Sequence, residues 1–290
     1  MRKLLGIALL TFLLVIGWSV LLFNNRPSVA ADYGSRLFQS HQYDRPIASG
    51  AIAQTPAQEV KAQEVTYGTL NKKPITGYLA RPTNATKPLP GLIVIHEWWG
   101  LNDNIKTMTR RLAGEGYTAL AVDLFNGQVA DNPQQAKKQV QTAANQTQQL
   151  KENIQQAYQY LEKNQEATKI GSIGWCFGGS WSLNTALLLP KQLDAAVIYY
   201  GGDLKTDPKQ LRPLEMPILG IFGALDDNPS VKTVRAFESA LKSLDKPAEI
   251  YVYEGADHAF ANPSGTRYNA KAAEDAWEKT SAFLNKHLKG

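Results

Sequence analysis

The chain has one cysteine and four histidines in 290 residues, and these small numbers exclude several kinds of site. One cysteine forms neither an internal disulfide nor a CxxC metal motif. The histidines, at positions 41, 96, 258 and 287, show no HExxH-type spacing. We therefore expect no metal and no other cofactor.

Long runs of like charge are also missing. The chain carries 31 Lys and Arg against 26 Asp and Glu, a net charge of +5, and no block of five like charges occurs. Phosphate binding needs Lys and Arg clustered on one face, so nucleic acid is not an expected partner. The apolar fraction of 43% is sufficient for a sizeable core.

Residues 1–31 are expected to direct the chain to a membrane. Two basic residues precede an apolar run over residues 4–23, and the small residues at 28–31 fit a signal-peptide cleavage site. The run is also about 20 residues long, which is enough to span a bilayer. A cleaved signal peptide and an uncleaved anchor both stay open, with a buried core helix as a third alternative. The first two predict a body that is exported (periplasmic or extracellular) or membrane-tethered, and not cytoplasmic.

Residues 32–60 show neither helical nor strand periodicity and are predicted to be a flexible linker. The pattern becomes regular in residues 61–290, where apolar runs alternate with amphipathic helices. The apolar runs typical of buried strands cover residues 91–97, 118–125, 169–175, 195–201, 217–223 and 249–255. An alternating pair, at 65–70 and 75–82, comes before them. This order predicts an α/β domain with a mostly parallel central sheet and helices on both faces.

Residues 171–180, "GSIGWCFGGS", place the lone cysteine, Cys176, in a Gly-x-nucleophile-x-Gly spacing. The motif lies between an apolar strand and an apolar helix. A sharp strand-to-helix turn needs small flanking residues and projects the central side chain above the sheet. The following helix N-terminus favours a thiolate. Cys176 is therefore a candidate nucleophile, and a packed structural cysteine is the alternative. Ser180 and Ser182 follow on the helix, where they are misplaced for attack.

Two further candidates follow later strands. Asp226 comes just after the strand at 217–223, and His258 just after the strand at 249–255. The order nucleophile, acid, base is the one expected of a triad in this architecture. His258 would take the thiol proton, and Asp226 would hold the imidazole tautomer. Asp227 is the alternative for the acid.

"HEWWG" at 96–100 follows the strand that is expected to feed the oxyanion hole. The backbone N–H groups of Trp98 and Phe177 are its natural donors. Glu97 is unusual beside a thiol, because a carboxylate disfavours the thiolate. A solvated loop glutamate is the alternative interpretation of Glu97.

Together these stretches resemble the dienelactone hydrolase family of the α/β-hydrolase superfamily over residues 62–288. The matching motifs are "HEWWGLND", "VDLF", "GWCFGG", "YYGG", "GALDDNPS" and "DHAF". The resemblance implies a Cys–His–Asp triad at Cys176, His258 and Asp226 that cleaves a cyclic enol ester. It implies that Glu97 gates the thiol, holding it neutral until substrate arrives and then accepting its proton. It also implies that Tyr199 lines the substrate pocket.

The chain departs from the family at two arginines that bind the substrate carboxylate. One family arginine falls in the stretch that corresponds to residues 127–150, where the only basic residues are Lys137 and Lys138. The other follows the catalytic histidine a few residues later, where this chain has Asn262 and the nearest arginine is Arg267. This departure predicts a less anionic substrate than dienelactone. We expect a monomeric hydrolase of small lactones or activated and enol esters that works through a thioester-type acyl-enzyme. A non-catalytic or thiol-redox binding protein on the same scaffold is the alternative.

Overall fold

The computed structural model describes residues 29–44 and 55–290. Within them eight strands form one sheet: β1 (Val60–Leu70), β2 (Lys73–Pro82), β3 (Gly91–Ile95), β4 (Thr118–Val122), β5 (Ile170–Trp175), β6 (Ala195–Tyr199), β7 (Ile218–Gly223) and β8 (Ala248–Tyr253). The α-helices are α2 (Val29–His41), α3 (Asp103–Gly114), α4 (Pro133–Asn145), α5 (Thr147–Gln159), α6 (Phe177–Leu188), α7 (Pro208–Leu211), α8 (Val231–Lys242) and α9 (Ala270–Leu284). Two π-helical turns, η2 (Tyr160–Asn164) and η3 (Asn285–Lys289), extend α5 and α9.

The strand order is β1-β2-β4-β3-β5-β6-β7-β8. β1 pairs antiparallel with β2 and β2 with β4, whereas every pair from β4 to β8 is parallel. β3 to β7 are buried along their whole length, as continuous apolar runs of a parallel sheet require. The predicted mostly parallel sheet with a leading antiparallel pair is confirmed.

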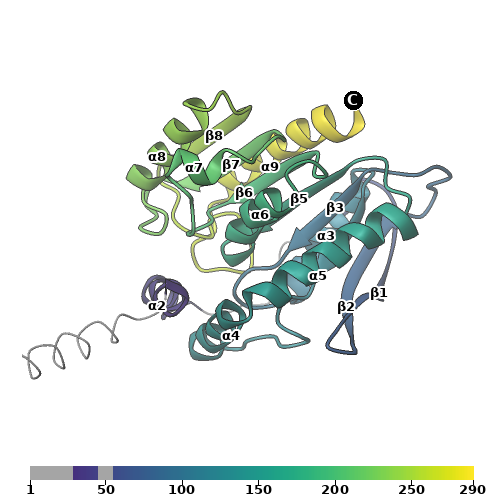
Figure 1. Ribbon diagram of the computed structural model, residues 1–290, viewed down its shortest axis with the longest axis horizontal. Helices are drawn as coiled ribbons and strands as arrows, with labels where there is room; N and C mark the ends of the chain where they lie inside the picture. Colours follow the sequence, from purple (N-terminus) through teal and green to yellow (C-terminus); the bar gives the residue numbers. More distant parts are fainter. Residues whose placement is uncertain (1–28, 45–54) are drawn as a thin grey trace, which may run out of the picture.

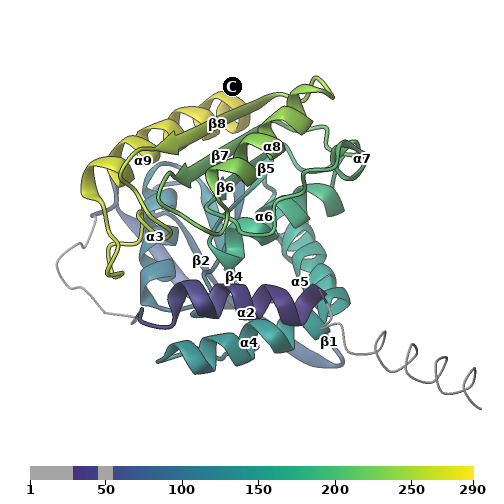
Figure 2. The same cartoon turned by 90° about the vertical axis from the view of Figure 1, so that its left-hand side faces the viewer.

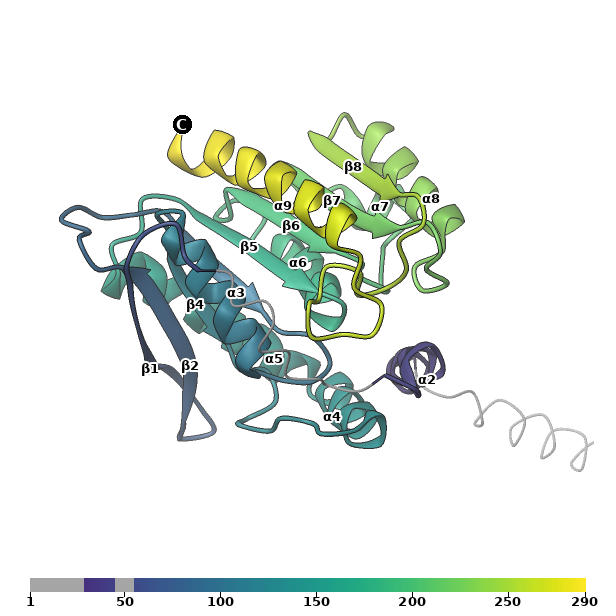
Figure 3. The same cartoon turned by 180° about the vertical axis from the view of Figure 1, so that it is seen from behind.

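Helices cover both faces of the sheet. α5 and α6 lie in front of it in Figure 1, and α3 and α9 lie on the opposite face, which is turned to the viewer in Figure 3. Capping side chains fix where several helices begin: Asn102 accepts a hydrogen bond from the Ile105 N–H, and Asn132 from that of Gln135. The helical region that begins after Asn132 is divided at Gln146 into α4 and α5.

Helix α2 corrects the sequence interpretation, because residues 32–44 were expected to be part of a linker. α2 instead packs along α4, beyond the carboxyl ends of the central strands (Figure 2). Leu37 is fully buried, and the Tyr33 hydroxyl is 2.9 Å from the Ser180 hydroxyl on α6. Arg267 donates to the Ser40 carbonyl and, at 3.2 Å, to the Asp44 carboxylate. Tertiary contacts supply most of the stability of so short a helix, and the sequence by itself does not show them.

The apolar run of the predicted targeting segment lies outside the described residues, and export stays a prediction. Among residues 29–44 and 55–290, no helix has the length and apolar character that crossing a bilayer requires.

Candidate active site

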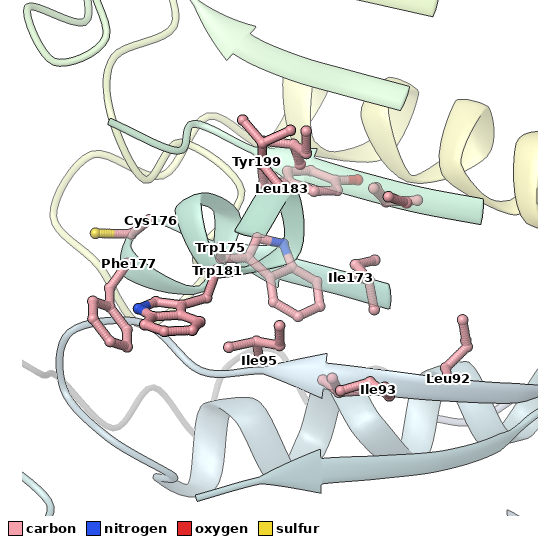
Figure 4. Packing of buried hydrophobic residues seen from close by; sticks show 14 of the residues in the cluster. Leu92, Ile93, Ile95, Ile173, Trp175, Cys176, Phe177, Trp181, Leu183 and Tyr199 are labelled. Carbon is pink, nitrogen blue, oxygen red and sulfur yellow. The ribbon is translucent and has the colours of Figure 1, made fainter. Parts of the chain in front are cut away.

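Cys176 lies between the end of β5 and the first residue of α6, in a strained turn. Its φ of 56° and ψ of −115° are unfavourable for an L-residue with a side chain. A Cβ on Gly174 would overlap the Gly178 carbonyl oxygen, so only glycine allows the strand and helix to approach this closely. The turn directs the sulfur away from the hydrophobic side chains around Ile173 and Leu92 (Figure 4). The local geometry is that of a nucleophile elbow.

His258 and Asp226 meet at the same edge of the sheet. Nδ1 of His258 donates to Oδ2 of Asp226 over 2.7 Å, and both side chains are buried. The other carboxylate oxygen of Asp226 accepts from the Asn228 N–H at 2.7 Å. Asp227, the alternative acid, is exposed to solvent. The structure thus brings together the two side chains that the sequence separates by 32 positions.

The sulfur of Cys176 and a ring nitrogen of His258 lie within 4.8 Å of each other. Because Asp226 occupies Nδ1, Nε2 is the nitrogen left for the thiol. Burial by itself lowers the pKa of His258, but the negative charges of Asp226 and Cys176 outweigh it and hold that pKa well above its usual value. The pair therefore favours a protonated imidazole next to sulfur.

Glu97 is buried, with 2% of its surface exposed, so the interpretation as a solvated loop residue is wrong. Burial raises the pKa of Glu97 to about 7, against the opposing effects of His258 and of a hydrogen bond from Asn262. Nδ2 of Asn262 donates to Oε2 of Glu97 at 2.6 Å. Asn262 stands where the family pattern has a substrate-binding arginine, and in this chain its amide binds Glu97.

The predicted oxyanion donors belong to two segments, each of which follows a strand. Phe177 is the first residue of α6, where helix N–H groups have no intrahelical acceptor. Trp98 follows β3 and is 1% exposed. Their backbone role stays a prediction. The two serines beyond the elbow are otherwise engaged: Ser180 contacts Tyr33, and Ser182 contacts Ser172 at 2.8 Å.

His41 was assigned to the linker, yet it lies at the centre of the site. Its ring centroid is 4.5 Å from that of His258 and 5.1 Å from the Trp98 ring. Burial lowers the pKa of His41 to about 4, with a smaller contribution from the neighbouring His258. No sequence motif indicates this contact, because only the docking of α2 brings His41 to the sheet edge.

Tyr199 does not occupy the predicted pocket. Its hydroxyl contacts Thr280 Oγ1 at 2.7 Å and donates to the Ala276 carbonyl at 3.1 Å, both on α9. The next residue, Tyr200, is the one that faces the site. Its ring is 5.1 Å from that of His258, and its buried hydroxyl has no hydrogen-bond partner among the described residues. Tyr200 lies just past the end of β6 with a φ of 37°, and this turn of the backbone decides which tyrosine of "YYGG" faces the site.

The basic residues near the family's arginine positions contact α2. Lys137 lies 4.7 Å from the centroid of the Phe38 ring, and Arg267 binds Ser40 and Asp44. Lys138, on the same helix as Lys137, has no ion pair within the described part of the chain. The cations that could have replaced the family's arginines are thus largely committed to holding α2.

Comparison with known proteins decides the family. The model of the dienelactone hydrolase family matches residues 75–288. The chain belongs to the dienelactone hydrolase family. It is 34% identical over 253 residues to a protein of Saccharolobus solfataricus provisionally named carboxymethylenebutenolidase, covering 73% of this chain and 94% of the other. A protein of the same provisional name from Escherichia coli K12 is 32% identical over 256 residues, covering 83% and 93%.

A solved structure agrees with this assignment. The crystal structure of a provisionally named dienelactone hydrolase from Klebsiella pneumoniae superposes with a TM-score of 0.71 at 29% identity, covering 79% of this chain and all of the other. The fold is therefore the α/β-hydrolase fold. Membership of the dienelactone hydrolase family makes the chain a carboxylic ester hydrolase.

Proposed function

We propose that this dienelactone hydrolase-family protein cleaves small lactones and activated or enol esters with Cys176 as nucleophile. The observation that carries the proposal is one arrangement: a cysteine on a strained strand-to-helix turn, beside an imidazole that a buried carboxylate orients. A nucleophile, a base and an orienting acid in this order constitute a catalytic triad.

The reaction follows from these positions. The Cys176 sulfur attacks the ester carbonyl carbon, and the acyl C–O bond breaks to give a thioester. His258 donates a proton to the departing oxygen, which remains on the same molecule when the substrate is a lactone. Water then attacks the thioester, His258 takes its proton, and the C–S bond breaks to release the acid. The N–H groups of Trp98 and Phe177 would stabilise the oxyanion of each tetrahedral intermediate.

Glu97 would control the protonation of the thiol. Its carboxylate is buried beside His258, and its pKa of about 7 allows it to gain and lose a proton near neutrality. When it is ionised, it accepts the thiol proton as substrate enters; when it is protonated, it cannot. Asn262 holds one of its oxygens, which supports a fixed carboxylate rather than a mobile one.

The chemistry and the surroundings favour small, weakly charged substrates. A thiolate is a strong nucleophile but also a good leaving group, so it suits activated esters and lactones better than amides. A cavity of about 350 Å³ between α2 and α6 has Phe177 in its wall, but none of Cys176, Asp226 and His258 lines it. Its wall also carries Arg36, Lys151 and Lys205, so the case for a weakly charged substrate depends on other residues. The commitment of Arg267 and Lys137 to α2 supports a substrate without a strong anionic group.

A thiol-redox role has less support. Redox-sensor cysteines are solvent-accessible, whereas Cys176 is 2% exposed and the chain has no second cysteine. Entry of substrate to this buried thiol would require a shift of α2, whose His41 has a ring nitrogen within 4.8 Å of the sulfur.

We also propose that residues 1–31 export or tether this hydrolase and that its body acts as a monomer. The support is the basic-then-apolar sequence with small residues at 28–31. N-terminal sequencing of protein recovered from fractionated cells would test the first part, and an unprocessed cytoplasmic chain would contradict it. Light scattering would test the second.

The test of the activity uses Cys176→Ala and Cys176→Ser against a panel of lactones and aryl esters. We expect kcat/KM to fall by at least about 10³-fold in both variants. Mass spectrometry of the quenched wild-type reaction should show the acyl group on Cys176. Undiminished turnover in Cys176→Ala would reject the proposal.

A further inference from the structure

The proposed hydrolysis makes no use of the second histidine of the site. His41 is 2% exposed, and its ring contacts that of His258 edge to face. One ring nitrogen of His41, one of His258 and the Cys176 sulfur all lie within 4.8 Å of one another. Three potential metal ligands from α2, the elbow and the loop after β8 thus converge at one buried point.

The two imidazoles have the same kind of hydrogen-bond partner, a carboxylate at Nδ1. Nδ1 of His41 lies 2.6 Å from Oδ2 of Asp44, and Nδ1 of His258 lies 2.7 Å from Oδ2 of Asp226. Because the carboxylates accept, each Nδ1 carries a proton, and each Nε2 presents a lone pair when its ring is neutral. The second proton that His258 holds next to sulfur leaves as a metal binds. Both Nε2 atoms are buried and have no hydrogen-bond partner within the described residues. A carboxylate on the far nitrogen is the usual outer contact of a metal-binding histidine.

We propose that His41, Cys176 and His258 form a binding site for a Zn²⁺ ion. Two imidazole nitrogens and a thiolate are a donor set that borderline-soft zinc prefers, and a fourth position stays open for water. Ions at about 2.0–2.3 Å from each ligand need donor atoms roughly 3.3–3.6 Å apart. The three donor atoms lie within 4.8 Å of one another, so binding would require the side chains to draw together by about 1 Å. Sequence spacing could not indicate this site, because its ligands come from three distant segments.

Zinc at this point would inhibit the hydrolase. The thiol releases its proton to solvent as the Zn–S bond forms, and the sulfur and Nε2 of His258 are then no longer free for catalysis. The inhibition rests on the proposed function, whereas the binding itself does not. The two are therefore measured separately.

Binding is tested on the full chain prepared without a polyhistidine tag. Equilibrium dialysis with Zn²⁺ should give one tightly held ion per chain, and Co²⁺ should give a thiolate-to-cobalt charge-transfer absorption band. Cys176 is the only cysteine of the chain, so the band reports this sulfur alone and disappears in Cys176→Ser.

Substitutions in α2 separate this site from other zinc binding. We expect His41→Ala and His41→Gln to weaken Zn²⁺ binding by about 100-fold, and Asp44→Asn by about 10-fold, as loss of an outer contact does. His287→Ala is the matched control, since His287 lies in η3 near the C-terminus and should bind as the wild type does. His41→Gln keeps a polar side chain of similar size, which protects the test against misfolding of the alanine variant.

Wild-type affinity in a folded His41→Gln variant, or a cobalt complex without the thiolate band, would overturn the metal site. For inhibition, the rate with Zn²⁺ is divided by the metal-free rate of the same protein, and wild type should lose activity at zinc concentrations about 100-fold below those that affect His41→Gln. Zinc binding with no hydrolysis of any ester would support this site and reject the proposed function. Hydrolysis without zinc binding would do the reverse.

Discussion

Asp226 holds His258 through a single buried hydrogen bond of 2.7 Å to Nδ1. The contact fixes the ring so that Nε2 turns toward the thiol, and it joins the loops that follow β7 and β8. Its neighbour Asp227 has the same chemistry but is exposed. The two adjacent aspartates therefore offer a comparison within one loop.

We predict that Asp226→Asn lowers kcat by about 10²–10⁴-fold, because an amide no longer selects the required imidazole tautomer. Asp227→Asn should leave kcat within about twofold of wild type. Steady-state kinetics on one aryl ester would check both. Equal losses of kcat in the two variants would mean that catalysis depends on the conformation of the loop and not on the Asp226 carboxylate.

Glu97→Gln should change the pH dependence of catalysis. With the pKa of Glu97 near 7, wild-type kcat/KM should rise as the pH increases through that value, because only the ionised carboxylate accepts the thiol proton. The glutamine variant should have a lower kcat/KM, and its kcat/KM should not rise as the pH increases through 7. The rate of Cys176 alkylation against pH gives a second readout, and an unchanged profile would remove the gating role.

The same carboxylate predicts a change in stability. Folding raises the pKa of Glu97 from 4.5 to about 7, so the folded state holds the proton more tightly than the unfolded one. The resulting stabilisation is complete below pH 4.5 and is lost as the pH rises through 7, a difference of about 3 kcal/mol. Glu97→Gln has no such loss. Its free energy of unfolding relative to wild type should therefore increase between pH 4.5 and 8 in urea titrations; parallel curves would contradict the prediction.

Arg267 is expected to control access to the thiol. It donates to the Ser40 carbonyl and to Asp44, and both contacts hold the end of α2 that carries His41. Loss of hydrogen bonds to a charged group costs about 1–3 kcal/mol. Arg267→Ala should therefore accelerate alkylation of Cys176 about tenfold. Exposed Arg212 provides the control, and Arg212→Ala should react at the wild-type rate.

The α/β architecture could be predicted because buried parallel strands are continuous apolar runs bounded by loops. The placement of Cys176, Asp226 and His258 followed from the same rule, since each lies in the turn or loop that follows a strand. What could not be predicted depends on packing between distant segments. The contact of His41 on α2 with His258 depends on the docking of that helix. Tyr199 and Tyr200 differ in direction because Tyr199 ends β6, whereas Tyr200 lies in the turn after it. The burial of Glu97, which decides its pKa, is likewise a tertiary property.

The elbow itself can be tested through Gly174. A Cβ there would overlap the Gly178 carbonyl oxygen, a backbone atom that moves only if α6 moves away from β5. We predict that Gly174→Ala lowers the free energy of unfolding by about 2–3 kcal/mol, and that kcat falls further than this loss of stability explains, because the shift carries Cys176 with it. Gly91→Ala is the control: it also lies in a buried strand, but its added Cβ meets side chains, the nearest being Ala167 Cβ at 3.0 Å. Gly91→Ala should lower the free energy of unfolding but keep a kcat close to that of wild type. If both variants kept kcat while losing stability, the close approach of β5 and α6 would serve packing alone, and the position of the sulfur would not depend on it.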